Sequence, residues 1–568
     1  MSAQLKNKVF AKYQIDMKEL AWLILIFIGA IGFRLILMTK TYAVGFDEVN
    51  YLKLAADAKL NGISHVMHPY WPPLFPLALA AFSYIVPNYE LAGRLLSILC
   101  NVALIFPFYF LVKQHLGKRI AYLVALLVAF YTMYAKYSVK IETEALYIFL
   151  AILGIFIGWS TLNKRSVWKS LIVGILFGGA YLLRPEGIGF LLVFLGLTGV
   201  VIIINLFSKQ KVGKYFLIIL LSFAGFMVVA FPYLNYLKNV TGGWTISAKG
   251  ISNQLGELYL RTKAPDEPHP FHVLRDNNTR LIEDEIYHLG NFTANLKHEK
   301  TMSKDVSIFG ILKKIGLHNY QIMTKEFLQV FPLPIVIILV LGLLAVPWTR
   351  KDFIFEGYLL CFVLFFWFLL IPSFHISIRY FIPLMPLCFI WLVKGGDRLK
   401  AWIEATLSNV NTIGVPTKWI QLLATILVVG IVVFGAIIPE FAKQMKLSRL
   451  STQEWDPAIE QKEAGLWLKA HGVKSPIVMA YNHAVSFYAG NYDIRESVEI
   501  PENKVADLIA YARYRGVNYL VLDDRYKAKH PLISDLYEEK DIPPDLKLIY
   551  TKRQPNGLAT HIYEILKP

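Results

Sequence analysis

Two adjacent carboxylates, Asp47 and Glu48, follow directly after the first long apolar run of the chain. Acids at the edge of a membrane-spanning segment are costly unless they are solvated or paired with a cation. Acids also favour the first turn of a helix, and a helix is predicted here from Val49 to Leu60. The pair therefore has two interpretations, a solvated helix start or a general base that accepts a proton from a reacting hydroxyl group.

Arginines stand at the ends of later apolar runs, where their guanidinium groups are suited to binding a phosphate group. These residues are Arg94, Arg184 and Arg379. Arginine pairs with phosphate oxygens through two parallel hydrogen bonds. The alternatives are structural: Arg94 anchors a span at headgroup level, and Arg184 pairs with Glu186. An unpaired charge inside an apolar run is expensive, which favours a functional role for Arg379.

His375 and Glu144 lie at the same predicted edge of the membrane. His375 shares a corner with Arg379 and is a further candidate for binding the phosphate, and Glu144 begins a predicted span. Oxygen ligands from Asp47, Glu48 and Glu144 would suit a hard divalent cation, which is left open as a cofactor. No cysteine or histidine spacing typical of a metal site is present, so an obligatory metal is not expected.

The composition predicts that these residues are carried by a polytopic membrane bundle. The chain has 568 residues, 55% of them hydrophobic, and its mean hydropathy is +0.46. Several uncharged apolar runs approach the roughly 20 residues that a helix needs to cross a bilayer. The net charge of +17 is concentrated in short connections between these runs, as the positive-inside rule predicts. A nucleic-acid partner is therefore not expected, whereas membrane lipids are.

Placing the basic connections in the cytoplasm gives about eleven crossings, with the N-terminus cytoplasmic. The apolar stretch from Pro72 to Val86 is short and begins with prolines, so a helix over 73–87 is predicted to lie in the outer interface. The predicted spans are 20–39, 90–112, 120–137, 144–161, 170–183, 187–207, 214–234, 327–347, 353–372, 376–395 and 418–439. Nearly every unusual polar residue then falls on the extracytoplasmic side of a cell (inner) membrane.

Two domains follow from this topology. Residues 1–439 form a transmembrane domain with external loops at 40–72 and 235–326, and residues 440–568 form a soluble extracytoplasmic domain. The second domain alternates short β-rich runs with amphipathic helices, which predicts a small α/β fold. Helices are expected at Glu460–Ala470 and Val505–Tyr514, and strands at Pro476–Tyr481, Val517–Leu522, Lys547–Tyr550 and His561–Ile565. The fold class is therefore an all-α membrane bundle with a C-terminal α/β domain.

A family resemblance is carried by short motifs that occur in order along nearly the whole chain. The chain resembles the GT-C class of polyprenyl-phosphate-sugar glycosyltransferases, in the superfamily of protein O-mannosyltransferases and aminoarabinose transferases (glycosyltransferase family 39-like). The motifs are Asp47-Glu48, Pro72-Pro73-Leu74-Phe75, Ala92-Gly93-Arg94, Thr143-Glu144, Leu183-Arg184-Pro185-Glu186-Gly187, Arg379-Tyr380 with Pro383 and Pro386, and Glu463-Ala464-Gly465-Leu466-Trp467-Leu468.

The resemblance implies a site and a reaction. Asp47 matches the family's general base and Glu48 its neighbour, while Glu144, Tyr51 and Trp71 are expected to orient the sugar, the acceptor or a metal ion. Trp71 stands where the aminoarabinose branch often has a lysine, and the oligosaccharyltransferase signature Trp-Trp-Asp-Tyr-Gly is absent.

The expected reaction is transfer of a sugar from a polyprenyl-phosphate donor to a hydroxyl group of a protein, lipid or glycan. The leaving phosphate is a weak base and needs no general acid, so a single base-assisted displacement would invert the anomeric centre. Two alternatives are kept: a glycan ligase or polymerase that uses a polyprenyl-diphosphate-linked chain, and a lipid or solute transporter.

Overall fold

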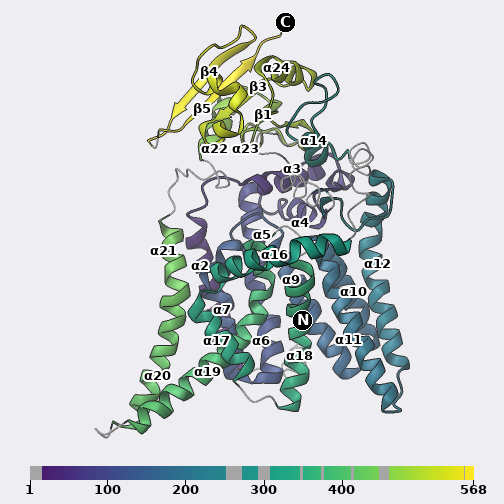
Figure 1. The fold of residues 1–568 in the computed structure, drawn as a ribbon, viewed down its shortest axis with the longest axis vertical. Coiled ribbons are helices and arrows are strands. Elements are labelled where there is room, and N and C mark those ends of the chain that lie inside the picture. Colours follow the sequence, from purple (N-terminus) through teal and green to yellow (C-terminus); the bar gives the residue numbers. More distant parts are fainter. Residues whose placement is uncertain are drawn as a thin grey trace.

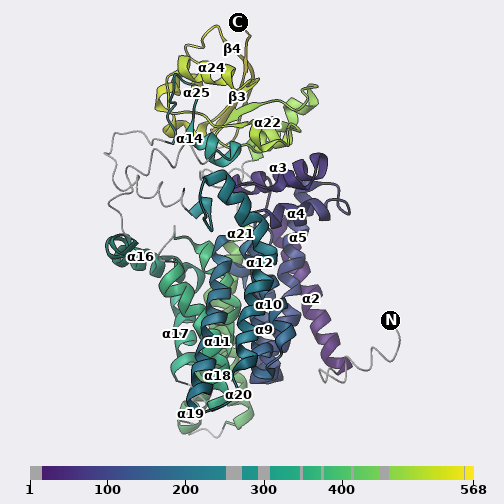
Figure 2. The same cartoon turned by 90° about the vertical axis from the view of Figure 1, so that its right-hand side faces the viewer.

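The computed structural model describes residues 16–250, 252, 271–291, 308–345, 349–371, 376–410, 415–446, 459–555 and 557–567. Its described part is an elongated helical bundle with a small α/β domain at one end (Figures 1 and 2). Helix α3 lies between the bundle and that domain (Figure 1). The expected fold class, a helical membrane bundle with a C-terminal α/β domain, is confirmed.

The bundle is built from apolar helices that run along its long axis. They are α2 (Met17–Met38), α5 (Tyr89–Ala103), α6 (Ile105–Leu116), α7 (Lys118–Phe130), α9 (Glu144–Lys164), α10 (Val167–Tyr181), α11 (Ile188–Phe207), α12 (Gly213–Thr241), α17 (Leu333–Leu344), α18 (Arg350–Phe365), α19 (Met385–Asn409) and α20 (Thr417–Val432). Shorter helices flank them: α8 (Thr132–Tyr137), α16 (Ile308–Val330) and α21 (Ile438–Met445).

Seven helices of the described residues are long and apolar enough to cross a membrane, or eight if a bent pair is one span. The chain is therefore a multi-pass membrane protein, and the expected number of about eleven crossings stays a prediction. The difference arises because several predicted spans are short helices. Helix α7 has 13 residues and ends at Tyr131, where the backbone is extended, and α10 has 15 residues. Both fall below the roughly 20 residues of a full crossing.

Two helix pairs in the bundle pack at very short range because glycines face each other. A Cβ atom on Gly174 of α10 would lie 2.0 Å from the Ser222 carbonyl oxygen of α12. One on Gly342 of α17 would lie 1.8 Å from the Trp391 carbonyl oxygen of α19. Only a residue without a side chain permits such a close approach. Close packing of this kind stabilises helix pairs in a membrane, because lipid is as apolar as the side chains and the hydrophobic effect does not drive the helices together.

The basic connections lie together at the end of the bundle away from the α/β domain. Arg119, after α6, donates to Asp397 of α19 at 2.7 Å. The Arg165 guanidinium lies 5.4 Å from the centre of the Tyr215 ring, which joins the α9–α10 turn to the start of α12. This gathering of positive charge at one end is the asymmetry that the positive-inside rule describes.

Short helices cover the other end of the bundle. They are α3 (Phe46–Asn61), η1 (Ile63–Val66) and α4 (Leu74–Phe82). Helix α4 has nine residues, too few to cross a bilayer. The segment Asn319–Val330 of α16 meets Leu333–Leu344 of α17 at 98°, so α16 runs across the bundle rather than along it (Figure 1).

The C-terminal domain is a five-stranded sheet with the strand order β2-β1-β3-β5-β4. Strands β2, β1 and β3 are parallel, whereas β5 is antiparallel to β3 and β4. The strands are β1 (Val478–Ala480), β2 (Ser497–Val498), β3 (Tyr519–Asp523), β4 (Leu546–Arg553) and β5 (Ala559–Ile565), and the main helices are α22 (Ile459–Ala470), α23 (Ala484–Tyr488), α24 (Val505–Tyr514) and α25 (Ser534–Tyr537). Apolar clusters lie on both faces of this sheet.

Residues 271–291, which belong to the loop predicted to be external, pack against the C-terminal domain. Leu274 and Leu281 are buried in the same apolar cluster as Leu508 of α24 and Leu520 of β3. Short helices α14 (Ile282–Asp284) and η3 (Glu285–Leu289) belong to this part. The domain core is thus assembled from two segments that are far apart in the sequence.

Candidate active site

Asp47 and Arg379 meet at the end of the bundle that faces the C-terminal domain. Asp47 is the second residue of α3, and Arg379 lies in the short helix η7 (Ile378–Tyr380) that precedes α19. Arg379 Nη1 donates to Asp47 Oδ2 at 2.6 Å across 332 positions of sequence. About a quarter of each side chain is exposed, 25% for Asp47 and 28% for Arg379. This ion pair is therefore accessible to a ligand.

Glu144 and Arg184 extend the pair into a network. Glu144 is the first residue of α9, and Arg184 directly precedes the short helix η2 (Pro185–Gly187) between α10 and α11. The Glu144 Oε1 atom accepts from Arg184 Nη1 at 2.7 Å and from Arg379 Nε at 2.6 Å. Only 1% of the Glu144 side chain is exposed. One buried carboxylate thus fixes both guanidinium groups side by side.

Further acids surround the two arginines. Arg379 Nη2 lies 3.6 Å from Glu142 Oε2, and Arg184 Nη2 lies 3.3 Å from Glu186 Oε1. The charge of Glu142 is attracted by Arg379 and repelled by Glu144 and Glu48. Its burial raises the pKa of Glu142 to about 7, against the charges of Arg379 and Lys140.

The pKa of Asp47 moves in the opposite direction. Burial alone would raise it, but the positive charges of Arg379 and Lys249 outweigh burial and hold the pKa of Asp47 below its ordinary value. Asp47 is therefore a carboxylate across the neutral pH range. It can accept a proton there, and its basicity is limited as long as Arg379 remains paired with it.

Lys249 joins the site to an aromatic cluster. Its Nζ atom lies 4.6 Å from the centre of the Tyr70 ring and 4.7 Å from that of the Trp71 ring. The Trp71 ring also packs edge-on against Tyr51 at 5.3 Å, and Trp71 Nε1 donates to the Tyr287 carbonyl oxygen at 3.1 Å. Tyr51 and Trp71 are both buried. They form a wall behind Lys249, and their direct contact with a sugar stays a prediction.

Glu48 and Arg94 do not join this network. The two carboxylate oxygens of Glu48 accept the backbone N–H groups of Gly45 and Ile141, each at 2.8 Å. Arg94 is buried and donates to the backbone carbonyl oxygens of Ala43 and Val139, each at 3.0 Å. Both side chains tie the backbone just before Asp47 to the backbone of residues 139–141.

Arg94 also connects this backbone to the C-terminal domain through Glu90. Arg94 Nη2 donates to Glu90 Oε1 at 3.0 Å. The other oxygen of Glu90 accepts from Lys462 Nζ at 2.9 Å and from the Tyr488 hydroxyl at 3.0 Å. The segment before α3 is therefore held both by the bundle and by the C-terminal domain. The expected contact of Arg94 with the donor phosphate stays a prediction.

The predicted oxygen ligands for a divalent cation are bonded to groups of the protein itself. Oxygens of Asp47 and Glu144 each lie 2.6 Å from an Arg379 nitrogen, and both oxygens of Glu48 are engaged by backbone N–H groups. Arg379 thus supplies positive charge beside the carboxylates that would bind a cation, and the divalent cation stays a prediction. His375, the remaining predicted phosphate ligand, lies outside the described residues.

Three charged residues of the network were not singled out as site residues from the sequence: Glu142, Glu186 and Lys249. Glu142 stands two residues before Glu144, and Glu186 two residues after Arg184. Residues this close to a predicted site residue share its end of the span, and that spacing was the signal available. Lys249 lies in a polar loop without comparable spacing.

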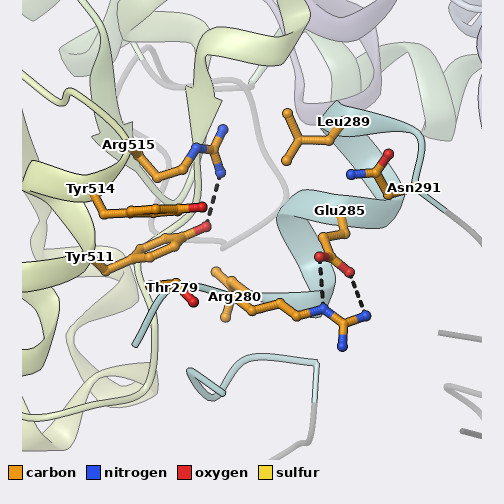
Figure 3. A pocket seen from close by; sticks show the side chains of 9 residues that line it. Thr279, Arg280, Glu285, Leu289, Asn291, Tyr511, Tyr514 and Arg515 are labelled. Carbon is orange, nitrogen blue, oxygen red and sulfur yellow. Dashed lines mark hydrogen bonds and ion pairs between the residues drawn. The ribbon is translucent and has the colours of Figure 1, made fainter. Parts of the chain in front are cut away.

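A separate cavity of about 450 Å³ lies between residues 279–291 and helix α24. Figure 3 shows Arg280 joined to Glu285 on one side and Arg515 joined to Tyr511 on the other. None of the predicted site residues lines this cavity. It therefore belongs to the junction of loop and C-terminal domain rather than to the candidate active site.

Comparisons with known proteins agree with the resemblance drawn from the sequence. Residues 68–233 match the family model described as dolichyl-phosphate-mannose-protein mannosyltransferase. No curated protein sequence matches the chain. The suspected relationship to the GT-C glycosyltransferases is confirmed by this family match together with the structural comparisons.

Solved structures of membrane glycosyltransferases share the fold. The oligosaccharyltransferase of Archaeoglobus fulgidus in its apo form matches with a TM-score of 0.56 and 12% identity, over 95% of this chain and 74% of that chain. The same enzyme, AglB, in complex with an inhibitory peptide and a dolichol-phosphate, matches with a TM-score of 0.53 and 12% identity, over 97% and 74%. ArnT from Cupriavidus metallidurans bound to undecaprenyl phosphate matches with a TM-score of 0.49 and 13% identity, over 95% and 98%. The two AglB matches, at this identity, establish the GT-C fold.

Proposed function

We propose that this protein transfers a sugar from a polyprenyl-phosphate donor to a hydroxyl group of an acceptor, with inversion, on the extracytoplasmic face of the membrane. The observation that carries the proposal is the network of Asp47, Glu144, Arg184 and Arg379 at one end of an apolar bundle. A lipid-linked phosphate at the membrane surface would reach the partly exposed Arg379. The family description of residues 68–233, which names a dolichyl-phosphate-linked mannose donor, supports the same reaction class.

Arg379 and Arg184 are assigned to the donor phosphate. Glu144 aligns both guanidinium groups by accepting one hydrogen bond from each, and Arg184 is held over the ring of Tyr380, 5.0 Å from its centre. Negative charge grows on the phosphate as the sugar leaves, and preorganised cationic donors stabilise that charge. Because the phosphate leaves as a weak base, no residue has to protonate it.

Asp47 is assigned as the general base. The acceptor oxygen forms a bond to the anomeric carbon while the bond from that carbon to the phosphate oxygen breaks, and the hydroxyl proton passes to the Asp47 carboxylate. A donor phosphate that draws Arg379 away from Asp47 would remove the larger of the two charges that lower the Asp47 pKa. Donor binding would therefore strengthen the base when it is needed.

The remaining residues are assigned to positioning. Glu48 and Arg94 hold the backbone before and beside Asp47, and Lys249 with Trp71 borders the space next to it. No step is routed through a metal ion, because the carboxylates of the site are paired with arginines. We place the N-terminus in the cytoplasm, the transmembrane domain at 1–439 and the extracytoplasmic domain at 440–568.

Product analysis with defined donors tests this proposal. Membranes that contain the protein would be supplied with a polyprenyl-phosphate monosaccharide or a polyprenyl-diphosphate oligosaccharide, and the acceptor fraction analysed by mass spectrometry. We expect the addition of one sugar from the monophosphate donor, at a rate at least about 10²-fold lower with Asp47→Asn. Asp57→Asn is the matched control because this acid lies on the same helix, where it pairs with His65 at 3.3 Å.

Other outcomes identify the alternatives. Transfer of a whole chain from the diphosphate donor would replace the proposal by a glycan ligase. Movement of the donor across vesicles without a covalent product would replace it by a transporter. Unchanged transfer in Asp47→Asn would remove Asp47 from the role of base.

A further inference from the structure

Two histidines and a glutamate gather where the external loop meets the C-terminal domain. His288 lies in η3, His483 directly precedes α23, and Glu499 follows β2. The Nε2 atoms of His288 and His483 lie 3.2 Å and 2.9 Å from Glu499 Oε1. Each residue offers a ligand atom within 4.8 Å of the other two. All three residues are 1% exposed, so the group is sealed from solvent.

Hydrogen bonds within the protein leave this group incompletely satisfied. Among the described residues, Nδ1 of His288 and Nδ1 of His483 are buried without a hydrogen-bond partner.

Three cationic side chains near this group are hydrogen-bonded to other residues, and one of them, Lys529, donates to the Tyr481 hydroxyl at 2.8 Å. Lys53 Nζ donates to Ser497 Oγ at 2.8 Å and to the Asp493 carbonyl oxygen at 3.3 Å. Arg515 Nη1 pairs with Asp284 Oδ2 at 2.6 Å. Neither contacts the Glu499 carboxylate directly in these hydrogen bonds, so its charge is not neutralised by an ion pair with either residue.

A zinc ion suits both the chemistry and the spacing. Two neutral imidazoles and one carboxylate, with water in a fourth position, are a known ligand set for zinc. Bonds of about 2.1 Å in a tetrahedral site place ligand atoms about 3.4 Å apart. The two observed separations of 2.9 Å and 3.2 Å need to widen by only a few tenths of an ångström.

We propose that His288, His483 and Glu499 bind one zinc ion that fastens the external loop to the C-terminal domain. The site was not predicted from the sequence, because the ligands are separated by 16 and 211 positions and match no compact zinc spacing. It is also distinct from the arginine–carboxylate network, since it uses none of its residues.

The zinc site would act on the candidate active site through one residue. Tyr287 precedes His288, and its carbonyl oxygen accepts from Trp71 Nε1 at 3.1 Å. The Tyr287 ring also packs edge-on against Tyr70, with ring centres 4.6 Å apart. Fixing His288 therefore fixes the aromatic wall beside Lys249.

Metal analysis of the full-length protein tests the proposal independently of its catalytic activity. The detergent-purified protein, free of any histidine tag, would be dialysed against metal-free buffer and its zinc content measured by mass spectrometry. We expect one zinc ion per chain in the natural protein and its loss in His483→Ala and Glu499→Gln. Zinc-free natural protein that does not take up added zinc, or variants that retain zinc, would overturn the proposal.

His272→Ala is the matched control. His272 joins the same two segments through Glu283 and Glu502, at 3.4 Å and 2.9 Å, but 29% of its side chain is exposed. We expect this variant to keep its zinc. A strong chelator should lower the unfolding temperature of the natural protein and of His272→Ala, and leave that of Glu499→Gln unchanged. An equal response in all three proteins would contradict the assigned ligands.

Discussion

Asp47 and Glu48 are neighbours in the chain, but their carboxylates are bonded in two different ways. The oxygens of Glu48 accept backbone N–H groups at two places in the fold. Asp47 instead accepts from the side chain of Arg379, and a quarter of it is exposed. Each acid lies near an arginine, Arg94 or Arg379, so residue types alone do not separate the two clusters.

The two acids differ in whether a ligand can replace their hydrogen-bond partners. A charge that is bonded to backbone groups cannot leave them without moving the chain, so Glu48 and Arg94 form part of the framework. A charged side chain that is bonded to another side chain can exchange this partner for a ligand whose charge has the same sign as the partner's. Asp47 and Arg379 satisfy this condition, and the substitutions below test how far the distinction holds.

The largest difference is expected between Asp47→Asn and Glu48→Gln. Asp47→Asn should lower the rate of sugar transfer by about 10²–10⁴-fold, because the amide cannot accept the acceptor's proton. Its unfolding temperature should change little, since the side chain is partly exposed. Transfer rates per folded molecule and thermal unfolding in detergent would be measured for both variants. An equal loss of rate in the two variants would erase the distinction.

Arg379→Lys is expected to have the next largest effect. Lysine keeps the positive charge but cannot reach Asp47 and Glu144 with two differently directed N–H groups, as Arg379 does. We expect kcat to fall by about 10²-fold, because stabilisation of the leaving phosphate is lost in the transition state. Arg94→Lys is the comparison: it should reduce the yield of folded protein and leave kcat nearly unchanged. The reverse pattern would exchange the roles of the two arginines.

Glu48→Gln should reveal a structural rather than a chemical role. The amide can accept one of the two backbone N–H groups, and the other N–H, of Gly45 or Ile141, loses its acceptor. A buried donor without a partner costs about 1–3 kcal/mol of stability. Denaturant or thermal unfolding would measure this loss. A variant as stable as the natural protein, with a large loss of kcat, would make Glu48 catalytic.

The smallest expected effect is a change in how stability depends on pH. The pKa of Glu142 is raised from 4.5 to about 7, so the folded protein binds this proton more tightly than the unfolded chain does. The resulting stabilisation is complete below about pH 4.5 and is lost as the pH rises through about 7. Unfolding temperatures across this range should fall less steeply in Glu142→Gln than in the natural protein. Parallel curves would exclude this role of Glu142.

The sequence predicted most of the C-terminal fold because its elements have strong local patterns. The predicted helix Val505–Tyr514 coincides with α24, and the predicted strands Lys547–Tyr550 and His561–Ile565 lie within β4 and β5. The two-residue strand β2 was missed, since a segment this short has no recognisable period.

The charge pattern and the family motifs predicted which residues of the candidate site share one end of the bundle. The hydrogen bonds between these residues could be read only from the structure. The sequence suggested that Asp47, Glu144, Arg184 and Arg379 share one end of the bundle, and hydrogen bonds of 2.6–2.7 Å join them in the structure. The sequence did not distinguish Glu48 and Arg94 from these residues. The type of a residue does not indicate whether its side chain will bond to backbone atoms of another segment.

The shared core of residues 271–291 and the C-terminal domain has a consequence for biosynthesis. Leu274 and Leu281 complete an apolar cluster whose other members follow only after the last membrane helices have been made. In the proposed topology the external loop is translocated before its partner is made, and its apolar side chains stay uncovered in the interval. A fragment that starts at residue 459 would lack this early-made portion and should aggregate, which makes the complete chain the smallest practical unit for expression.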